Sequence, residues 1–300
     1  MLYPTTVSTH GRAGPVRRPD PSSRLMKRNM DSYFTISCPM PRIYRLEDPR
    51  GVFLTLLVGD SYAFLADTGT GIGDLCGTLS RLTDLPLIVA NTHGHIDHAG
   101  GNYLFPRVWL AEEDYSLVRQ GLSPESKQQI LSLSLLPPSF DQTGFLSYEG
   151  DNLLPLRKGQ VFDLGGLTVN VVPLPSHTKG SVGFFCPELE LLLTGDSISS
   201  VTYLVMEESC TVGEYITLLD EVGHLPFTRM LSAHEQTIMG RECLEAFRQC
   251  ALQVEPEKTV SFKNPFFPRH PGRLFVYETP LCPDGYAALV YSPEKLGRKS

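Results

Sequence analysis

The sequence predicts an α+β fold, a four-layer α/β/β/α sandwich in which two β-sheets pack face to face between outer helices. Two observations predict it. Short apolar runs of β-type residues gather in two halves of the chain, and a helical pattern closes each half. With 300 residues and 41% hydrophobic composition, the chain can bury a core of this size. We expect a single domain over residues 32–300.

Residues 1–31 differ from the rest of the chain. They carry six Lys or Arg and two acidic residues among Pro, Ser, Gly and Thr, and they contain no apolar segment of a secretory signal. We expect a disordered tail. The alternatives are an organelle transit peptide, or a start assigned upstream of a true start at Met26 or Met30.

Alternating apolar runs open the domain and predict an antiparallel meander, because Gly59, Asp60 and Ser61 form a hairpin turn between two of them. A helix follows over 72–83, where apolar residues recur at helical spacing. Residues 86–91 then form a short buried strand. The strands of the meander are expected at 42–48, 52–59 and 62–69.

A second strand-and-helix cycle follows the polar segment at 92–101. Residues 107–114 predict a strand, and 112–120 predict the start of a polar helix. The stretch 112–157 is irregular apart from a helical pattern at 124–136, because proline and glycine interrupt it. We expect this stretch to be an insertion on the substrate side of the domain.

Four short strands separated by turn residues begin the second half of the domain. A helix at 213–224, a strand at 229–234 and a helix at 241–254 follow them. Residues 255–300 are expected to form a C-terminal extension of short strands broken by proline. The four strands are expected at 161–166, 167–175, 181–187 and 189–196.

The composition excludes several classes of partner. The net charge is −7, so no basic field exists to hold nucleic acid. No apolar stretch approaches the roughly 20 residues of a membrane span, and we expect no membrane partner. Seven scattered cysteines without a CxxC pair indicate reduced thiols in a cytoplasmic protein with no structural disulfide. A monomer and a homodimer both fit this composition.

The densest group of chemically active residues is His93, His95, Asp97 and His98, four potential ligands within six residues. In an extended chain His93 and His95 point the same way, because side chains alternate with a period of two. A tight turn can then bring the other two to a neighbouring position. Imidazole nitrogens and a carboxylate suit Zn²⁺, and catalytic zinc keeps one position open for water.

Distant residues must complete the metal shells, and three stand in matching contexts. His177, Asp196 and His234 each follow an apolar strand. Strand ends that converge on one edge of the sandwich would gather all seven groups within coordination distance, with Asp196 between two metals. The remaining histidines lack such a setting and are expected at the surface or in packing: His10, His224 and His270.

Five motifs resemble, in chain order, those of the metallo-β-lactamase-fold hydrolase superfamily: ADTG, THGHIDHAGGN, PSHTKGS, LLLTGDS and SAHE. The resemblance covers residues 52–236 and implies a dinuclear metal site. By this resemblance, the first metal is bound by His93, His95 and His177, the second by Asp97, His98 and His234, both share Asp196, and Asp67 supports the site without binding a metal.

The resemblance also implies the cofactors and the chemistry. Two divalent cations per chain are expected, Zn²⁺ first and Mn²⁺ or Fe²⁺ as alternatives, because the same ligands accept all three. Such a pair lowers the pKa of bound water toward about 7, so hydroxide can attack a carbonyl carbon without a serine nucleophile. We expect Asp97 to be both a ligand and the proton carrier. Related oxygen-reducing flavodiiron proteins typically have Glu at the position of His95, so zinc hydrolysis is favoured over iron redox chemistry.

Within the superfamily, DHAGGN and HTKGS are most similar to hydroxyacylglutathione hydrolase, also called glyoxalase II. This similarity implies a thioesterase that acts on a small acyl thioester. That enzyme holds glutathione through a C-terminal helical region with basic residues, whereas residues 263–286 here read as strands and loops. The resemblance therefore does not extend to glutathione binding.

Two alternatives stay open. A lactonase or β-lactamase-like enzyme would cleave a cyclic ester or amide. Lactonases of this superfamily place a tyrosine three residues after the shared aspartate, but here Ser199 stands there and the nearest tyrosine is Tyr203. True β-lactamases are usually secreted, and no signal peptide is read here. The second alternative is a non-catalytic metal-binding module of the same fold.

Side chains near the expected site could form an apolar acyl pocket together with the insertion, because aromatic and methionine side chains supply adaptable contact area. Ordinary core packing is the alternative. Arginine side chains could receive an anionic substrate group or simply face solvent. The candidates are Tyr203, Met206, Phe266 and Phe267 for the apolar wall, and Arg269 and Arg273 for the anionic group.

Overall fold

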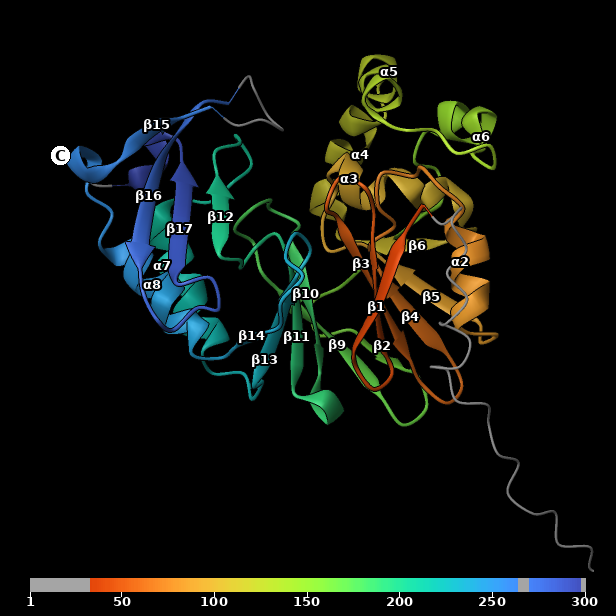
Figure 1. Ribbon diagram of the computed structural model, residues 1–300, viewed down its shortest axis with the longest axis horizontal. Coiled ribbons are helices and arrows are strands. Elements are labelled where there is room, and N and C mark those ends of the chain that lie inside the picture. Colours follow the sequence, from red (N-terminus) through yellow and green to blue (C-terminus); the bar gives the residue numbers. More distant parts are fainter. Residues whose placement is uncertain (1–32, 264–269, 298–300) are drawn as a thin grey trace, which may run out of the picture. The chain divides into compact units, whose positions relative to one another are not determined.

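Three β-sheets organise the chain in the computed structural model, which describes residues 33–263 and 270–297 (Figure 1). Two of these sheets form the sandwich that the sequence predicts, and the third was not expected. The tail predicted at 1–31 lies outside the described residues.

The first sheet contains seven strands in chain order. Its first four strands are an antiparallel meander, and its last three run parallel to the fourth. This arrangement confirms the predicted meander and adds one strand before it. The strands are β1 (Thr35–Met40), β2 (Ile43–Glu47), β3 (Phe53–Val58), β4 (Ala63–Ala66), β5 (Leu87–Ala90), β6 (Val108–Leu110) and β7 (Leu153–Pro155).

The second sheet has six strands in the order β14-β13-β11-β10-β9-β8. Strands β8 to β11 pair antiparallel, and β11 pairs in parallel with β13. The carboxyl ends of β9, β11 and β13 therefore lie on the same edge. The strands are β8 (Val161–Asp163), β9 (Thr168–Pro173), β10 (Val182–Cys186), β11 (Leu191–Gly195), β13 (Arg229–Ser232) and β14 (Met239–Gly240).

The two sheets pack face to face through a shared apolar core. Phe64 of β4 lies with its ring centroid 5.4 Å from that of Phe162 and 4.9 Å from that of Phe184, both in the second sheet. Helix α2 (Leu75–Leu82) packs Leu75 and Leu79 on the other face of the first sheet. These contacts bury apolar side chains on both faces of the sheet, as the predicted layer order requires.

Two helices cover the outer face of the second sheet. They are α7 (Val212–Val222), which begins with a capping box of Thr211 and Glu214, and α8 (Cys243–Leu252). Both pack in one cluster with Leu192 of β11 and Met230 of β13. The α/β/β/α sandwich predicted from the sequence is thereby confirmed.

The third sheet lies beside these helices, at the left of Figure 1, and has the order β12-β17-β16-β15. Its edge strand β12 pairs in parallel with β17 and joins residues far apart in the chain, with Val201 opposite Ala288. The described part of the C-terminal extension supplies three of the strands, the short strands that the sequence predicts. They are β12 (Val201–Leu204), β15 (Val260–Phe262), β16 (Gly272–Glu278) and β17 (Tyr286–Tyr291).

The stretch expected as an insertion, 112–157, is mostly helical. It contains α4 (Tyr115–Gly121), α5 (Pro124–Leu133) and α6 (Gln142–Ser147). Helix α6 corrects the expectation of irregular chain after α5, because the Asp141 carboxylate accepts a hydrogen bond from Gly144 N at 2.9 Å and so caps a new helix. These helices pack on α3 (Ile96–Ala99) and its neighbours through small apolar clusters of their own.

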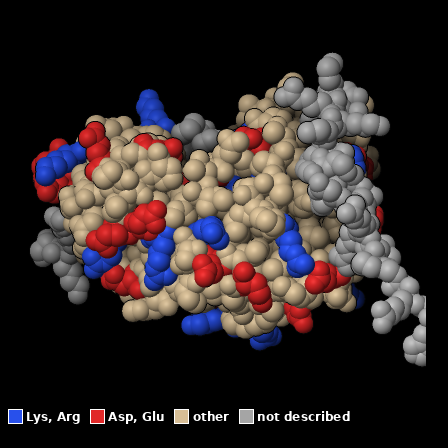
Figure 2. All heavy atoms as spheres, turned by 60° about the horizontal axis from the view of Figure 1, so that its bottom comes forward, with Lys and Arg blue, Asp and Glu red and all other residues tan. Residues whose placement is uncertain are grey.

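Three further observations bear on the expectations from composition. Among the described residues, no helix combines the length and apolar character needed to cross a membrane. All seven cysteines are free thiols. On the face shown in Figure 2, acidic and basic side chains are interspersed.

Candidate metal centre

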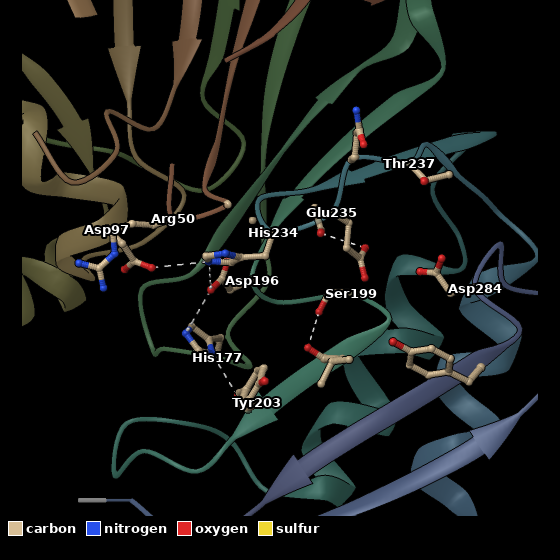
Figure 3. Close-up of a pocket in the computed structure, with 16 residues that line it drawn as sticks. Arg50, Asp97, His177, Asp196, Ser199, Tyr203, His234, Glu235, Thr237 and Asp284 are labelled. Atoms are coloured by element: carbon tan, nitrogen blue, oxygen red, sulfur yellow. Dashed lines mark hydrogen bonds and ion pairs between the residues drawn. The ribbon is translucent and has the colours of Figure 1, made fainter. Parts of the chain in front are cut away.

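Seven polar side chains meet where the strands of both sheets end. The loop after β5 carries His93 and His95, and the one-turn helix α3 that follows carries Asp97 and His98. The other three come from the loops after strands of the second sheet, and Figure 3 shows His234 directed toward Asp97 and His177 directed toward Asp196. They are His177 after β9, Asp196 after β11 and His234 after β13.

Three buried imidazole nitrogens face one another in a first group. His95 Nδ1 lies 3.0 Å from His93 Nε2 and 3.0 Å from His177 Nε2. One proton on His95 Nδ1 cannot serve both neighbours. A tetrahedral metal with bonds of about 2.0–2.1 Å to nitrogen separates its ligand atoms by roughly 3.3 Å, close to the spacing seen here. The donor set therefore fits a cation.

A second group combines two carboxylates with two imidazoles. Asp97 Oδ2 lies 3.7 Å from His98 Nε2 and 3.6 Å from His234 Nε2. Asp196 Oδ1 lies 3.4 Å from His98 Nε2, and its Oδ2 lies 3.3 Å from His234 Nε2. Both His98 Nε2 and Asp196 Oδ1 are buried, and neither has a hydrogen-bond partner within residues 33–263 and 270–297. Buried polar atoms without partners are costly, so these two atoms also fit a cation.

Asp196 lies between the two groups. Its Oδ2 is 3.7 Å from His177 Nε2 of the first group as well as close to His234 of the second. The structure thus places this carboxylate where a shared ligand would have to be. All seven residues that the sequence selected as candidate ligands lie together, in sets of three whose ligand atoms are within 4.8 Å of one another.

Burial and nearby charges shift the pKa of four of the histidines, downward for two and upward for the other two. Burial lowers the pKa of His93 well below its ordinary value and that of His177 to about 4, which keeps both imidazoles neutral. Burial would also lower the pKa of His98 and His234, but the carboxylates of Asp196 and Asp97 raise it, to about 8 for His234. The second group therefore attracts positive charge.

The outer nitrogens of the candidate ligands are held by acceptors. His98 Nδ1 donates to Asp67 Oδ2 at 3.0 Å, and His177 Nδ1 donates to the backbone oxygen of Tyr203 at 3.0 Å. Asp67 is itself fixed by Thr92, whose backbone N donates to Oδ1 at 2.7 Å. Such contacts leave the opposite nitrogen free for a metal. Asp67 thus lies where the sequence places a supporting residue.

Glu208 was not selected from the sequence. Its Oε1 lies 3.4 Å from His95 Nε2, the nitrogen that points away from the first group. Burial alone would raise the pKa of Glu208, but the hydrogen bond from His95 lowers it. It follows β12 in a segment without any motif, so only the folded chain shows its role.

Asp114 connects two of the ligand-bearing loops and was also not selected. Its Oδ2 accepts hydrogen bonds from Gly94 N at 2.9 Å and Thr178 Oγ1 at 2.6 Å, and its Oδ1 accepts one from Gly180 N at 2.9 Å. A Cβ on Gly94 would lie 2.7 Å from Asp114 O, and one on Gly180 would lie 2.6 Å from Asp114 Cγ. Both glycines therefore permit a close approach.

Arg45 supports the third ligand-bearing loop. This arginine is buried, and its Nη2 donates to Ser232 O at 2.8 Å and to Glu235 O at 2.9 Å, on either side of His234. Its guanidinium lies 4.4 Å from the centroid of the Phe53 ring. Burial lowers the pKa of Arg45 to about 10, so the group stays charged near neutral pH.

A cavity of about 560 Å³ opens beside the ligands (Figure 3). One side carries Asp97, Asp196, His177 and His234, and the third sheet forms the opposite side. The remaining lining residues include Arg50 and Gly51 from the β2–β3 turn, Glu235, Gln236 and Thr237 after His234, and Ser199, Val201, Tyr203, Asp284 and Tyr286 around β12 and β17.

The pocket residues expected from the sequence are only partly in place. Tyr203 lines the cavity, but Met206 packs in a buried cluster with Val205 and Val290 and is a core residue. Arg273 is not free for a substrate, because its guanidinium donates to Thr259 and to Pro256 O. Phe266, Phe267 and Arg269 lie outside the described residues.

The helical insertion does not wall this cavity, since none of the lining residues falls within 112–157. It is linked to the site by Asp114, which binds two ligand-bearing loops, and by its packing on α3. The expectation that the insertion lies on the substrate side is therefore wrong for this cavity. Among the other histidines, His224 and His270 are exposed, and His10 lies outside the described residues.

Comparison with known proteins identifies relatives of modest similarity. Acyl-coenzyme A thioesterase MBLAC2 of Homo sapiens is 27% identical over 116 residues, which cover 38% of this chain and 42% of that protein. Hydroxyacylglutathione hydrolase GloC of Haemophilus influenzae is 28% identical over 169 residues, which cover 54% of this chain and 71% of that protein. The match thus spans less than half of the thioesterase.

Solved structures share the fold. A metallo-beta-lactamase from Pontibacter korlensis has a TM-score of 0.53 at 13% identity and covers 74% of this chain and 100% of its own. The sec-alkylsulfatase Pisa1 from Pseudomonas sp. has a TM-score of 0.54 at 15% identity, covering 75% of this chain and 42% of its own. The family model described as the metallo-beta-lactamase superfamily matches residues 48–238, a span that contains all seven candidate ligands. The chain belongs to the metallo-beta-lactamase superfamily.

Proposed function

We propose that the protein is a metal-dependent hydrolase that cleaves acyl thioesters. The observation that carries the proposal is the convergence of seven ligand-type side chains beside one cavity, where His98 Nε2 and Asp196 Oδ1 are buried without a hydrogen-bond partner among the described residues. Superfamily membership and the names of two relatives, a thioesterase and a hydroxyacylglutathione hydrolase, support the same reading.

The residues present fit two divalent cations, and we propose Zn²⁺ because imidazole and carboxylate donors suit it. Such ions would polarise a substrate carbonyl and make water ionisable near neutral pH. The first would be held by His93, His95 and His177, the second by Asp97, His98 and His234, and Asp196 would be shared.

Asp97 is the residue that we propose as proton carrier. Burial alone would raise its pKa, but the charges of His98 and His234 lower it, so the carboxylate is ionised at neutral pH. It faces the cavity, and 27% of its side chain is exposed. An ionised carboxylate at this position can accept a proton and return it to the departing sulfur.

The hydrogen bond of Ser199 favours a thioester over a lactone as the substrate. This residue stands where lactonases of the superfamily have tyrosine, and its Oγ donates to Val201 O at 2.8 Å. The hydroxyl is therefore engaged within the protein. The cavity wall at Val201, Tyr203 and Tyr286 supplies apolar and aromatic surface for a small acyl group. We propose a small-molecule partner, in keeping with the net charge of −7.

The test combines metal analysis with a substrate panel. Protein purified in the presence of zinc is expected to hold two Zn²⁺ per chain and to hydrolyse S-lactoylglutathione or acyl-coenzyme A. A lactone and a β-lactam should be cleaved more slowly. His177→Ala should lose a metal and activity, whereas His224→Ala, which removes an exposed imidazole, should behave as the wild type. Two bound metals without turnover of any substrate would instead support a non-catalytic metal-binding module.

A further inference from the structure

Among the described residues that line the cavity, Arg50 is the one lysine or arginine. It lies in the turn between β2 and β3, and Figure 3 draws it at the Asp97 end of the cavity. The other charged lining residues, apart from histidine, are acidic. The position of this cation beside the candidate metal centre therefore bears on which substrates can enter.

The turn that carries Arg50 is firmly built. The buried Asp48 carboxylate accepts hydrogen bonds from Arg50 N at 2.9 Å and from Val52 N at 3.0 Å. Gly51, at φ 80°, supplies the left-handed residue that this turn requires. Two residues further along, Phe53 donates its N–H to the backbone oxygen of Ala233 at 2.8 Å, directly before His234. The turn is thus tied to a ligand-bearing loop.

The guanidinium of Arg50 is not engaged by the part of the chain that the structure describes. Within 33–263 and 270–297 it makes no hydrogen bond and no ion pair, although the side chain is partly buried. Asp97, on the same wall, directs its carboxylate to His98 and His234. Burial raises the pKa of the Asp48 carboxyl, and of the two charges that act on it Asp97 raises the pKa and Arg50 lowers it. Both charges therefore lie near this turn.

Away from Arg50, the wall of the cavity is acidic. It carries Glu235, whose carboxylate is occupied by Ser200 N and Ser232 Oγ, and Asp284, an exposed carboxylate in the β16–β17 turn. An anionic group of a substrate would be repelled there and attracted at Arg50. A planar guanidinium with free donors is suited to bind a carboxylate in a bidentate way.

We propose that Arg50 binds a carboxylate of the substrate and so selects anionic thioesters over neutral ones. This inference rests on the proposed thioesterase function and specifies its substrate class. The carboxylate can belong to the acyl group or to the thiol. A charge-assisted hydrogen bond at this position corresponds to a preference of about 10- to 100-fold.

The kinetic test uses four thioesters in a two-by-two design. Butanoyl and succinyl groups are each joined to N-acetylcysteamine, which is neutral, and to 3-mercaptopropanoate, which is anionic. The zinc-loaded wild type should prefer one of the anionic forms, and the side of the molecule that carries the effective charge identifies the source. Arg50→Gln should remove the preference while turnover of the fully neutral thioester stays within about twofold. Arg50→Lys should retain part of it.

Arg107→Gln is the matched control, because Arg107 is exposed and does not line the cavity. It removes one positive charge and should leave the preference intact. Equal zinc content and equal melting temperature of the three variants establish that the fold is unchanged. A loss of activity toward neutral and anionic thioesters alike in Arg50→Gln, or an unaltered preference, would overturn the proposal.

A binding measurement separates this inference from the proposed function. Calorimetric titration of the zinc-loaded protein compares 3-mercaptopropanoate with 3-mercaptopropanamide. Tighter binding of the carboxylate that is lost in Arg50→Gln supports the inference even when no thioester is cleaved, in which case only the thioesterase proposal fails. Thioester cleavage without any Arg50-dependent preference in either measurement leaves the thioesterase proposal standing and rejects the role of Arg50.

Discussion

Asp67 Oδ2 accepts a hydrogen bond from His98 Nδ1 at 3.0 Å, and both side chains are buried. Asp67 has a φ of 66°, in the left-handed region that aspartate tolerates better than most residues, so the chain turns sharply at the end of β4. The bond leaves His98 Nε2 directed toward Asp196 Oδ1, 3.4 Å away, without a hydrogen-bond partner in the described part of the chain. Asp67, which is not itself a candidate ligand, thus sets the orientation of the His98 ring.

Substituting Asp67 should weaken the second metal group specifically. In Asp67→Asn the charge that favours a proton on His98 Nδ1 is lost, and the affinity for the second cation should fall about 10- to 100-fold. Zinc titration followed by calorimetry measures both binding steps. Asp163→Asn, which changes an exposed aspartate of β8, is the control. Unchanged affinity for both cations in Asp67→Asn would contradict a supporting role.

Substituting Asp114 should weaken metal binding by both groups of candidate ligands. Asp114→Ala removes three hydrogen-bond acceptor contacts from two ligand-bearing loops and leaves Gly94 N and Gly180 N without their partner. Each buried donor left unpaired costs about 1–3 kcal/mol, so the free energy of unfolding should drop clearly. Urea denaturation of the metal-free protein gives this value, and zinc titration should show both steps weakened. If only one step changed, the proposed link between the loops would be wrong.

Substituting Arg45 should lower the free energy of unfolding more than substituting Arg42, which lies three residues earlier in the chain. Arg45→Met should lower the free energy of unfolding by about 1–3 kcal/mol, because Ser232 O and Glu235 O lose a buried donor. It should also weaken the cation that His234 would bind. Arg42→Gln breaks an exposed ion pair with Asp60 and should cost less than about 1 kcal/mol. Comparable losses in the two variants would argue against an anchoring role for Arg45.

The pH dependence of the metal-free protein follows from His177. Its folded pKa of about 4 lies below its ordinary value of 6.5, so the unfolded chain binds the proton first. The stabilisation is complete above about pH 6.5 and is lost as the pH falls toward 4. His234, with a pKa raised to about 8, contributes in the opposite sense, and its stabilisation is lost as the pH rises through 8.

Chemical denaturation between pH 4 and 7 with a chelator present tests this prediction. His177→Gln should show a weaker fall of the unfolding free energy with decreasing pH than the wild type. His224→Gln changes an exposed histidine and serves as control. Parallel curves for all three proteins would show that burial of His177 does not govern acid stability.

The sequence was most informative for ligand-type residues that directly follow predicted strands. All seven candidate ligands follow strands or lie in the short segment after β5, and the ends of parallel strands bring such residues to one edge. The sandwich could be predicted for the same reason, since each strand of β2, β3 and β4 is bounded by turn residues. These signals depend on near neighbours in the chain.

Residues that act across the fold left no such signal. Glu208, Asp114 and Arg45 each meet their partners only after distant segments pack, at sequence separations of 113, 20 to 66, and 187 to 190 residues. Met206 is of a residue type that often lines pockets, but it lies after β12 in a buried core cluster. Pattern analysis cannot assign such side chains, because their roles depend on tertiary contacts.

The pairing of β12 with β17 ties the far C-terminal strand to the first metal group. Tyr203 of β12, whose carbonyl holds His177, lies opposite Val290. A premature stop codon before Tyr286 would spare every candidate ligand yet remove the strand on which β12 is aligned. Protein truncated there should retain the first cation poorly, although every ligand motif is still present in its sequence.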